Sequence, residues 1–138
     1  MAAENVEVVR RVIAAFGERD RDTAARFLHP EVEWEPAGPG GVERTVYRGL
    51  EEIAQARDAL SEVWDTMRLE EVDIRDLGDS VLWLGRIHLR GSGSDVELDQ
   101  EFAQLFLVED GRVARSKAFL TWRDGLEAAG LPPMSGDS

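Results

Sequence analysis

The sequence contains no cysteine, so it offers neither a disulfide framework nor a thiolate nucleophile. It has no apolar run close to the roughly 20 residues that a membrane-spanning helix needs. Basic residues are also scarce, because 16 Lys and Arg stand against 28 Asp and Glu, for a net charge of −12. An acidic chain repels phosphate backbones and anionic lipid surfaces. We therefore expect no nucleic-acid partner and no membrane partner.

Histidine is scarce as well, with only His29 and His88 in the chain. Neither belongs to a cluster of His, Cys and carboxylate residues with the spacing of a metal site. Residues 91–94, Gly-Ser-Gly-Ser, are typical of a hairpin loop and lack the following helix that a phosphate cradle requires. We expect neither a metal nor a cofactor.

Hydrophobic spacing predicts helices in the first half of the chain. Residues 5–17 and 21–28 form two short candidates, and residues 53–67 repeat apolar side chains every three or four positions over about four turns. Residues 31–35 alternate as a strand that Pro36 ends. Between them and the long helix, the sequence predicts a loop at 36–42 and a short strand at 45–48.

The second half of the chain changes to a period of two. Candidate strands at 68–76, 81–90, 96–108 and 112–122 are separated by turn residues, which predicts an antiparallel meander. With 138 residues and 43% hydrophobic content, we expect one α+β domain, with a curved antiparallel sheet packed against the long helix and two N-terminal helices. The domain should span residues 1–131, followed by a disordered tail at 132–138.

Five segments together resemble a known family. They are residues 5–16, the Leu-His-Pro-Glu-Val-Glu-Trp-Glu-Pro run at 28–36, Val-Tyr-Arg-Gly at 46–49, Glu-Asp-Gly-Arg-Val at 109–113 and Asp-Gly-Leu-Glu-Ala-Ala-Gly-Leu at 124–131. In this order they resemble SnoaL-like members of the nuclear transport factor 2-like superfamily, which includes ketosteroid-isomerase-like and polyketide-cyclase-like proteins. The resemblance implies a cone-like sheet around a pocket and, frequently, a homodimer. It implies no single activity.

The resemblance also points to one catalytic candidate. The Glu35-Pro36 pair matches an Asp-Pro of the family, which would make Glu35 the general base of a proton transfer. However, strand alternation places Glu31, Glu33 and Glu35 opposite Trp34, as in a solvated acidic edge. The two other acidic positions of the related enzymes fall on Ala103 and Ala118, which argues against those reactions.

The remaining candidates are polar or aromatic side chains that a curved sheet could direct into an apolar pocket. For the aromatic residues the alternative is core packing, and for the histidine it is the polar outer face of the sheet. Gln104 shares a strand face with two phenylalanines, and its alternative is a subunit contact. The candidate ligand-binding residues are Trp34, Tyr47, Trp83, His88, Phe102, Gln104 and Trp122.

Two functions remain open for this pattern. One is a cofactor-independent isomerase, cyclase or hydratase that acts on a hydrophobic small molecule with Glu35 as base. The other is a non-catalytic ligand-binding or accessory protein that uses the same aromatic pocket. The charged N-terminal segment without an apolar signal core favours a cytoplasmic, bacterial-type protein.

A homodimer is expected because Leu82, Leu84, Leu105 and Leu107 place apolar area on sheet faces that the pocket does not need. Sedimentation at micromolar concentration should therefore give a species of twice the 15.4 kDa chain mass. A single 15.4 kDa species would contradict this prediction.

Overall fold

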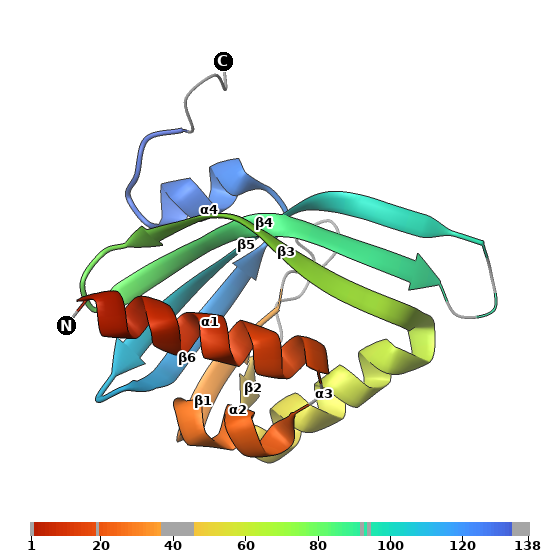
Figure 1. Ribbon diagram of the computed structural model, residues 1–138, viewed down its shortest axis with the longest axis horizontal. Helices are drawn as coiled ribbons and strands as arrows, with labels where there is room; N and C mark the ends of the chain where they lie inside the picture. Colours follow the sequence, from red (N-terminus) through yellow and green to blue (C-terminus); the bar gives the residue numbers. More distant parts are fainter. Residues whose placement is uncertain (1, 19, 37–45, 92, 94, 134–138) are drawn as a thin grey trace.

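The computed structural model describes residues 2–18, 20–36, 46–91, 93 and 95–133 (Figure 1). The structure does not describe residues 37–42 of the expected loop, the first residue of the short strand at 45–48, part of the turn at 91–94 and most of the tail at 132–138. The helices are α1 (Ala2–Glu18), α2 (Arg21–Phe27), α3 (Gly49–Val63) and α4 (Trp122–Ala128). The strands are β1 (Leu28–Glu35), β2 (Tyr47–Arg48), β3 (Trp64–Asp76), β4 (Ser80–Gly91), β5 (Glu97–Glu109) and β6 (Arg112–Phe119).

The strands form one sheet in the order β2-β1-β6-β5-β4-β3. Strands β3 to β6 make the expected antiparallel meander, and the α+β class is confirmed. The sheet is nevertheless mixed, because β1 pairs parallel to β6. Hairpins impose antiparallel pairing only on consecutive strands, and β1 and β6 stand at opposite ends of the sequence order.

Two predicted boundaries differ from the structure. The long helix ends at Val63, and Trp64 already pairs with Gly91 as the first residue of β3. A bulge between Trp64 and Thr66 lets Trp64 and Met67 line the same cavity although they are three positions apart. That spacing looks helical in the sequence. The last strand ends at Phe119, because the Thr121 side chain accepts a hydrogen bond from the Asp124 amide and starts α4.

The sheet is covered on both faces (Figure 1). Helices α1, α2 and α3 lie on one side, where Val9, Val81 and Trp83 belong to the larger core cluster. Helix α4 lies on the other side, where Leu126 packs with Leu82 and Leu84. Each of these side chains is no more than 1% exposed, and full burial of an apolar side chain contributes about 1.5–3 kcal/mol.

Helix α1 is attached to the meander at two points. The Asn5 side chain donates to the Gly78 carbonyl at 2.8 Å, which fixes its start beside the β3–β4 turn. Further along the helix, the Arg10 guanidinium donates two hydrogen bonds to the Glu71 carboxylate, at 3.1 and 3.0 Å. These contacts set where the second half of α1 crosses the sheet.

Two of the leucines expected at a subunit interface are internal to the chain. Leu82 and Leu84 are 0% exposed because α4 covers them, so the interpretation of these two as free apolar surface is wrong. Leu105 is partly buried against the same cluster. No helix in the described ranges is long and apolar enough to cross a membrane.

Close packing of α4 generates a stability prediction. A Cβ on Gly125 would lie 2.6 Å from the Ala103 Cβ, so Gly125→Ala should destabilise the protein by about 1–3 kcal/mol despite the better helix propensity of alanine. Urea unfolding measures this change. The control is Gly17→Ala in α1, where nothing lies within 4 Å, and it should be neutral or stabilising. Equal effects of the two variants would contradict the packing argument.

Candidate functional site

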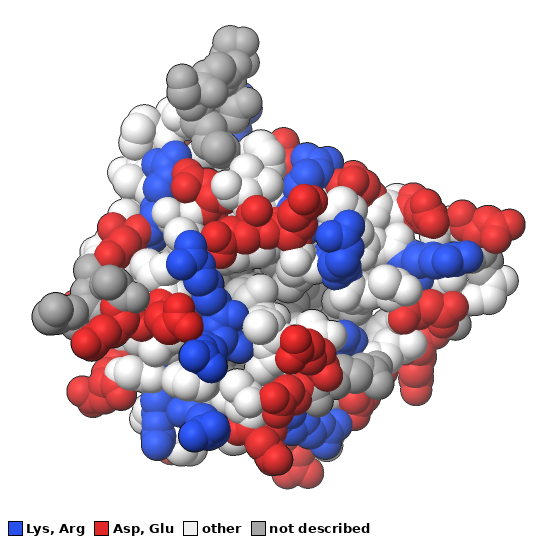
Figure 2. All heavy atoms as spheres, viewed as in Figure 1, with Lys and Arg blue, Asp and Glu red and all other residues white. Residues whose placement is uncertain are grey.

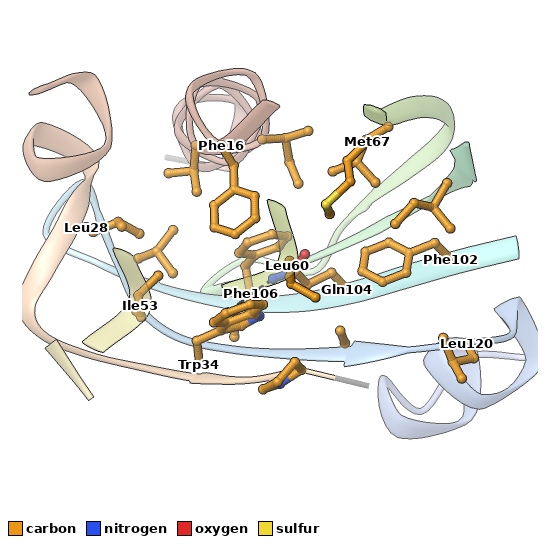
Figure 3. Close-up of a pocket in the computed structure, with 18 of the residues that line it drawn as sticks. Phe16, Leu28, Trp34, Ile53, Leu60, Met67, Phe102, Gln104, Phe106 and Leu120 are labelled. Atoms are coloured by element: carbon orange, nitrogen blue, oxygen red, sulfur yellow. Dashed lines mark hydrogen bonds between the residues drawn. The ribbon is translucent and has the colours of Figure 1, made fainter. Parts of the chain in front are cut away.

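A cavity of about 230 Å³ lies between the concave face of the sheet and the helices (Figure 3). Its floor comes from β1, β3, β4, β5 and β6, through residues that point to one face because side chains alternate along a strand, with a change of phase at the bulge in β3. Its roof comes from α1 and α3, through residues such as Phe16, Ile53 and Leu60. Phe16 and Trp34 meet edge to face at 5.6 Å between ring centroids. The enclosure is thus largely aromatic and aliphatic.

Polar side chains in the cavity are few and uncharged. Gln104 of β5 points into the space between Phe16, Leu60 and Phe106 (Figure 3). Its Nε2 donates to the Ser116 Oγ of β6 at 3.2 Å, and Ser116 is only 6% exposed. Gln100 also lines the cavity, four residues earlier on β5 and therefore about 13 Å away along the strand. Among the described residues that line the cavity there is no Asp, Glu, Lys, Arg or His.

Glu35, the candidate general base, does not line this cavity. Its neighbours Trp34 and Pro36 do, and alternation turns the Glu35 side chain to the opposite face of the sheet. There its Oε2 lies 3.5 Å from the Nζ of Lys117, the residue of β6 that pairs with Glu35 in the sheet. The bulge in β1 lies between Leu28 and Glu33 and leaves the alternation at Glu35 intact.

His88 also lies on the outer face of the sheet, outside the cavity. Its Nε2 is 2.9 Å from Glu70 Oε1 and its Nδ1 is 3.1 Å from Asp99 Oδ2. Asp99 in turn accepts from the Arg86 Nε at 2.7 Å, and this hydrogen bond lowers the pKa of Asp99 below its ordinary value. The residues on either side of His88, Ile87 and Leu89, line the cavity instead.

The predicted aromatic residues divide between four places, three of them on the inner side of the sheet. Trp34 and Phe102 line the cavity together with Gln104. Tyr47 lies beside it, with its ring 5.7 Å from that of Trp34. Trp83 is 1% exposed in the core under α1, with its ring 6.4 Å from Phe102.

Trp122 lies on the opposite side of the sheet from the cavity. It is the first residue of α4 and packs against the core cluster that contains Leu82 and Leu126. Its indole Nε1 donates to the Gly85 carbonyl at 2.8 Å. The structure therefore brings together three of the predicted ligand-binding residues and places Tyr47 next to them.

Sequence reasoning missed Ser116, Gln100 and the roof residue Phe16. A signal for the first existed, because Ser116 stands two residues before Ala118 on β6 and therefore shares its face. Gln100 similarly alternates with Phe102 and Gln104 on β5. Ala103, in contrast, faces α4 and is 0% exposed. The acidic position that the resemblance places at Ala103 therefore lies one residue away from Gln104 on the cavity face.

Charges of both signs are spread over the face shown in Figure 2, around a hollow of uncharged atoms near its centre. Arginines and acidic residues alternate there without a continuous basic patch on that face.

A SnoaL-like domain matches residues 9–116, and the chain therefore belongs to the SnoaL-like family. The resemblance read from the sequence segments is confirmed. The fold is that of the nuclear transport factor 2-like proteins, among which polyketide cyclases and isomerases are found. No curated protein matches the sequence.

Several solved structures share this fold. An NTF2-like protein of unknown function from Burkholderia pseudomallei K96243 is 20% identical, with 90% of this chain and 95% of that chain covered and a TM-score of 0.75. TerC, co-crystallised with polyporic acid, is 22% identical over 90% and 96% of the two chains, with a TM-score of 0.76. A putative SnoaL-like polyketide cyclase from Jannaschia sp. CCS1 is 21% identical over 96% and 95%, with a TM-score of 0.75. Identities this low show a shared fold and leave the activity open.

The outer-face cluster around His88 predicts a pH effect on stability. Because the pKa of Asp99 is lowered in the folded chain, its pairing with Arg86 contributes stability above the unfolded-state pKa and loses it as pH falls through the lowered value. In Arg86→Met, the pKa of Asp99 should rise toward its ordinary value, and the deficit in unfolding free energy should shrink in acid. Carboxyl NMR titration measures the pKa of Asp99, and urea unfolding at several pH values measures the deficit in unfolding free energy. Arg123→Met on α4 is the control, and a deficit that stays constant from neutral to acidic pH would refute the pairing.

Proposed function

We propose that the protein binds a small hydrophobic molecule in the cavity under α1 and α3, without proton transfer by a carboxylate of that cavity. The observation that carries this proposal is the lining: aromatic and aliphatic side chains surround Gln104 and Ser116, and no described lining residue carries a charge. Apolar concave sites with few polar groups are the usual form of small-molecule sites. TerC, which shares the fold, was crystallised with a small molecule.

The position of Glu35 favours binding over the isomerase, cyclase or hydratase alternative. A general base must lie within hydrogen-bond reach of the proton that it removes. Glu35 faces the opposite side of the sheet and lies beside Lys117.

Cavity size sets the scale of the ligand. A volume of about 230 Å³ lies below the roughly 300–1,000 Å³ of sites for drug-sized molecules. The proposed ligand is therefore a compact compound of one or two rings.

We propose in addition that the protein self-associates as a homodimer. The exposed apolar side chains that support it are Val63 at the end of α3 and Val96 and Leu98 around the start of β5, which are 58%, 54% and 42% exposed. Trp64 pairs with Gly91, whose amide donates to the Val96 carbonyl at 2.8 Å, so these residues lie near one another. Apolar surface of this kind marks interfaces. A cytoplasmic location also remains part of this proposal.

Binding is tested with 2-methylnaphthalene, a neutral two-ring compound, by saturation-transfer NMR and thermal unfolding. The wild-type protein should bind it, and Leu120→Trp, at a cavity residue that is 37% exposed, should weaken binding at least about tenfold by filling the space. Leu77→Trp is the matched control, because Leu77 is 38% exposed and lies outside the cavity lining.

Glu35→Gln tests whether Glu35 contributes to the binding site. If Glu35 takes no part in the cavity, this variant should bind the compound as the wild type does. Absence of binding in the wild type, or a loss in Leu77→Trp equal to that in Leu120→Trp, would overturn the proposed binding function.

A further inference from the structure

Resting on the proposed binding function, we infer that the cavity selects a neutral cyclic molecule with a hydroxyl or keto oxygen, which hydrogen-bonds to Gln104 and Ser116. The inference starts from the placement of this pair. The two side chains come from neighbouring strands, and their contact lies among Phe16, Leu60 and Phe106 (Figure 3). They are thus the polar point among the rings at the centre of the enclosure, while Gln100, the other polar side chain of the described lining, lies about 13 Å away along β5.

The pair has hydrogen-bonding capacity left over. A glutamine amide offers two N–H donors and a carbonyl acceptor, and a serine hydroxyl offers one donor and two acceptor positions. Within the described part of the chain, the bond from Gln104 Nε2 to Ser116 Oγ is the one hydrogen bond that either side chain makes. The Gln104 Oε1 and the Ser116 hydroxyl proton remain for a ligand. A ligand hydroxyl can donate to the first and accept from the second, and a ketone can accept from the second.

Charge complementarity restricts the ligand to the neutral form. An anion in the cavity would meet no cationic side chain among the described lining residues, and a cation would meet no carboxylate. Burial of an unpaired charge in apolar surroundings is strongly unfavourable. A neutral hydroxyl or carbonyl group needs only the hydrogen bonds that Gln104 and Ser116 supply.

Shape favours a ring system over a flexible chain. Phe16, Trp34, Trp64, Phe102 and Phe106 all contribute to the lining, and rings pack with other rings in edge-to-face or offset geometry. Together with the small volume, this describes a one- or two-ring alcohol or ketone.

Three matched naphthalenes test the inference by isothermal titration calorimetry and saturation-transfer NMR: 2-methylnaphthalene, 2-naphthol and 2-naphthoate. The ring system is constant, and only the substituent changes from apolar to hydroxyl to carboxylate. We expect 2-naphthol to bind about tenfold more tightly than 2-methylnaphthalene, as one or two satisfied hydrogen bonds provide. We expect 2-naphthoate to bind at least about a hundredfold more weakly than 2-naphthol.

Variants assign the preference to the pair. Gln104→Leu keeps the side-chain size, and it should retain binding of 2-methylnaphthalene but lose the preference for 2-naphthol. Ser116→Ala should reduce the same preference, and it provides a second test if Gln104→Leu does not fold. Gln55→Leu on α3, outside the lining of this cavity, is the matched control and should leave the preference unchanged.

The outcomes separate this inference from the proposed function on which it rests. If none of the three compounds binds, the proposed binding function fails and the inference fails with it. If 2-methylnaphthalene binds but 2-naphthol gains nothing, or 2-naphthoate binds best, the inference alone is overturned. A preference for 2-naphthol that survives in both Gln104→Leu and Ser116→Ala also overturns it.

Discussion

The arrangement of this protein depends on one stretch of β4 that has to be buried on both faces. Residues 81–84 are at most 1% exposed, with Val81 and Trp83 on the side of α1 and Leu82 and Leu84 on the side of α4. Two helices from opposite ends of the chain are therefore required to complete the core. The start of α1 is fixed beside the β3–β4 turn through Asn5, so the other half of the helix extends over the concave face. The cavity is the space that this half of α1 and α3 enclose without filling.

Alternation along the strands then separates two chemical environments across one sheet. The inner positions of β1, β5 and β6 carry Trp34, Gln104 and Ser116, and the outer positions carry Glu35 and Lys117. Charged groups thus pair where solvent reaches them, which avoids the desolvation free energy of a buried ion pair. The polar groups that remain on the enclosed side are neutral. The SnoaL-like fold supplies the concavity in this protein, while the identity of the inward residues decides which chemistry it supports.

Sequence periodicity was sufficient for the fold class and for the β3–β6 meander, and five short segments carried the family resemblance. Periodicity failed where local irregularity changes the phase of a strand. The bulge after Trp64 gives β3 a helical spacing, and the cap at Thr121 turns Trp122 from the last strand into α4. Of the site, Trp34, Phe102 and Gln104 were predictable because each lies on a regular strand. The roof residue Phe16 was not, because the sequence does not specify which turn of α1 passes over the sheet.

The neutral lining has a consequence for how binding responds to acidity. Every described side chain that lines the cavity keeps one protonation state across the physiological range, since none of them is an acid, a histidine or a lysine. The described lining therefore contributes no ionisation of its own to ligand affinity within that range. A pH profile of binding whose midpoint follows the ligand's own pKa then reports the protonation of the ligand.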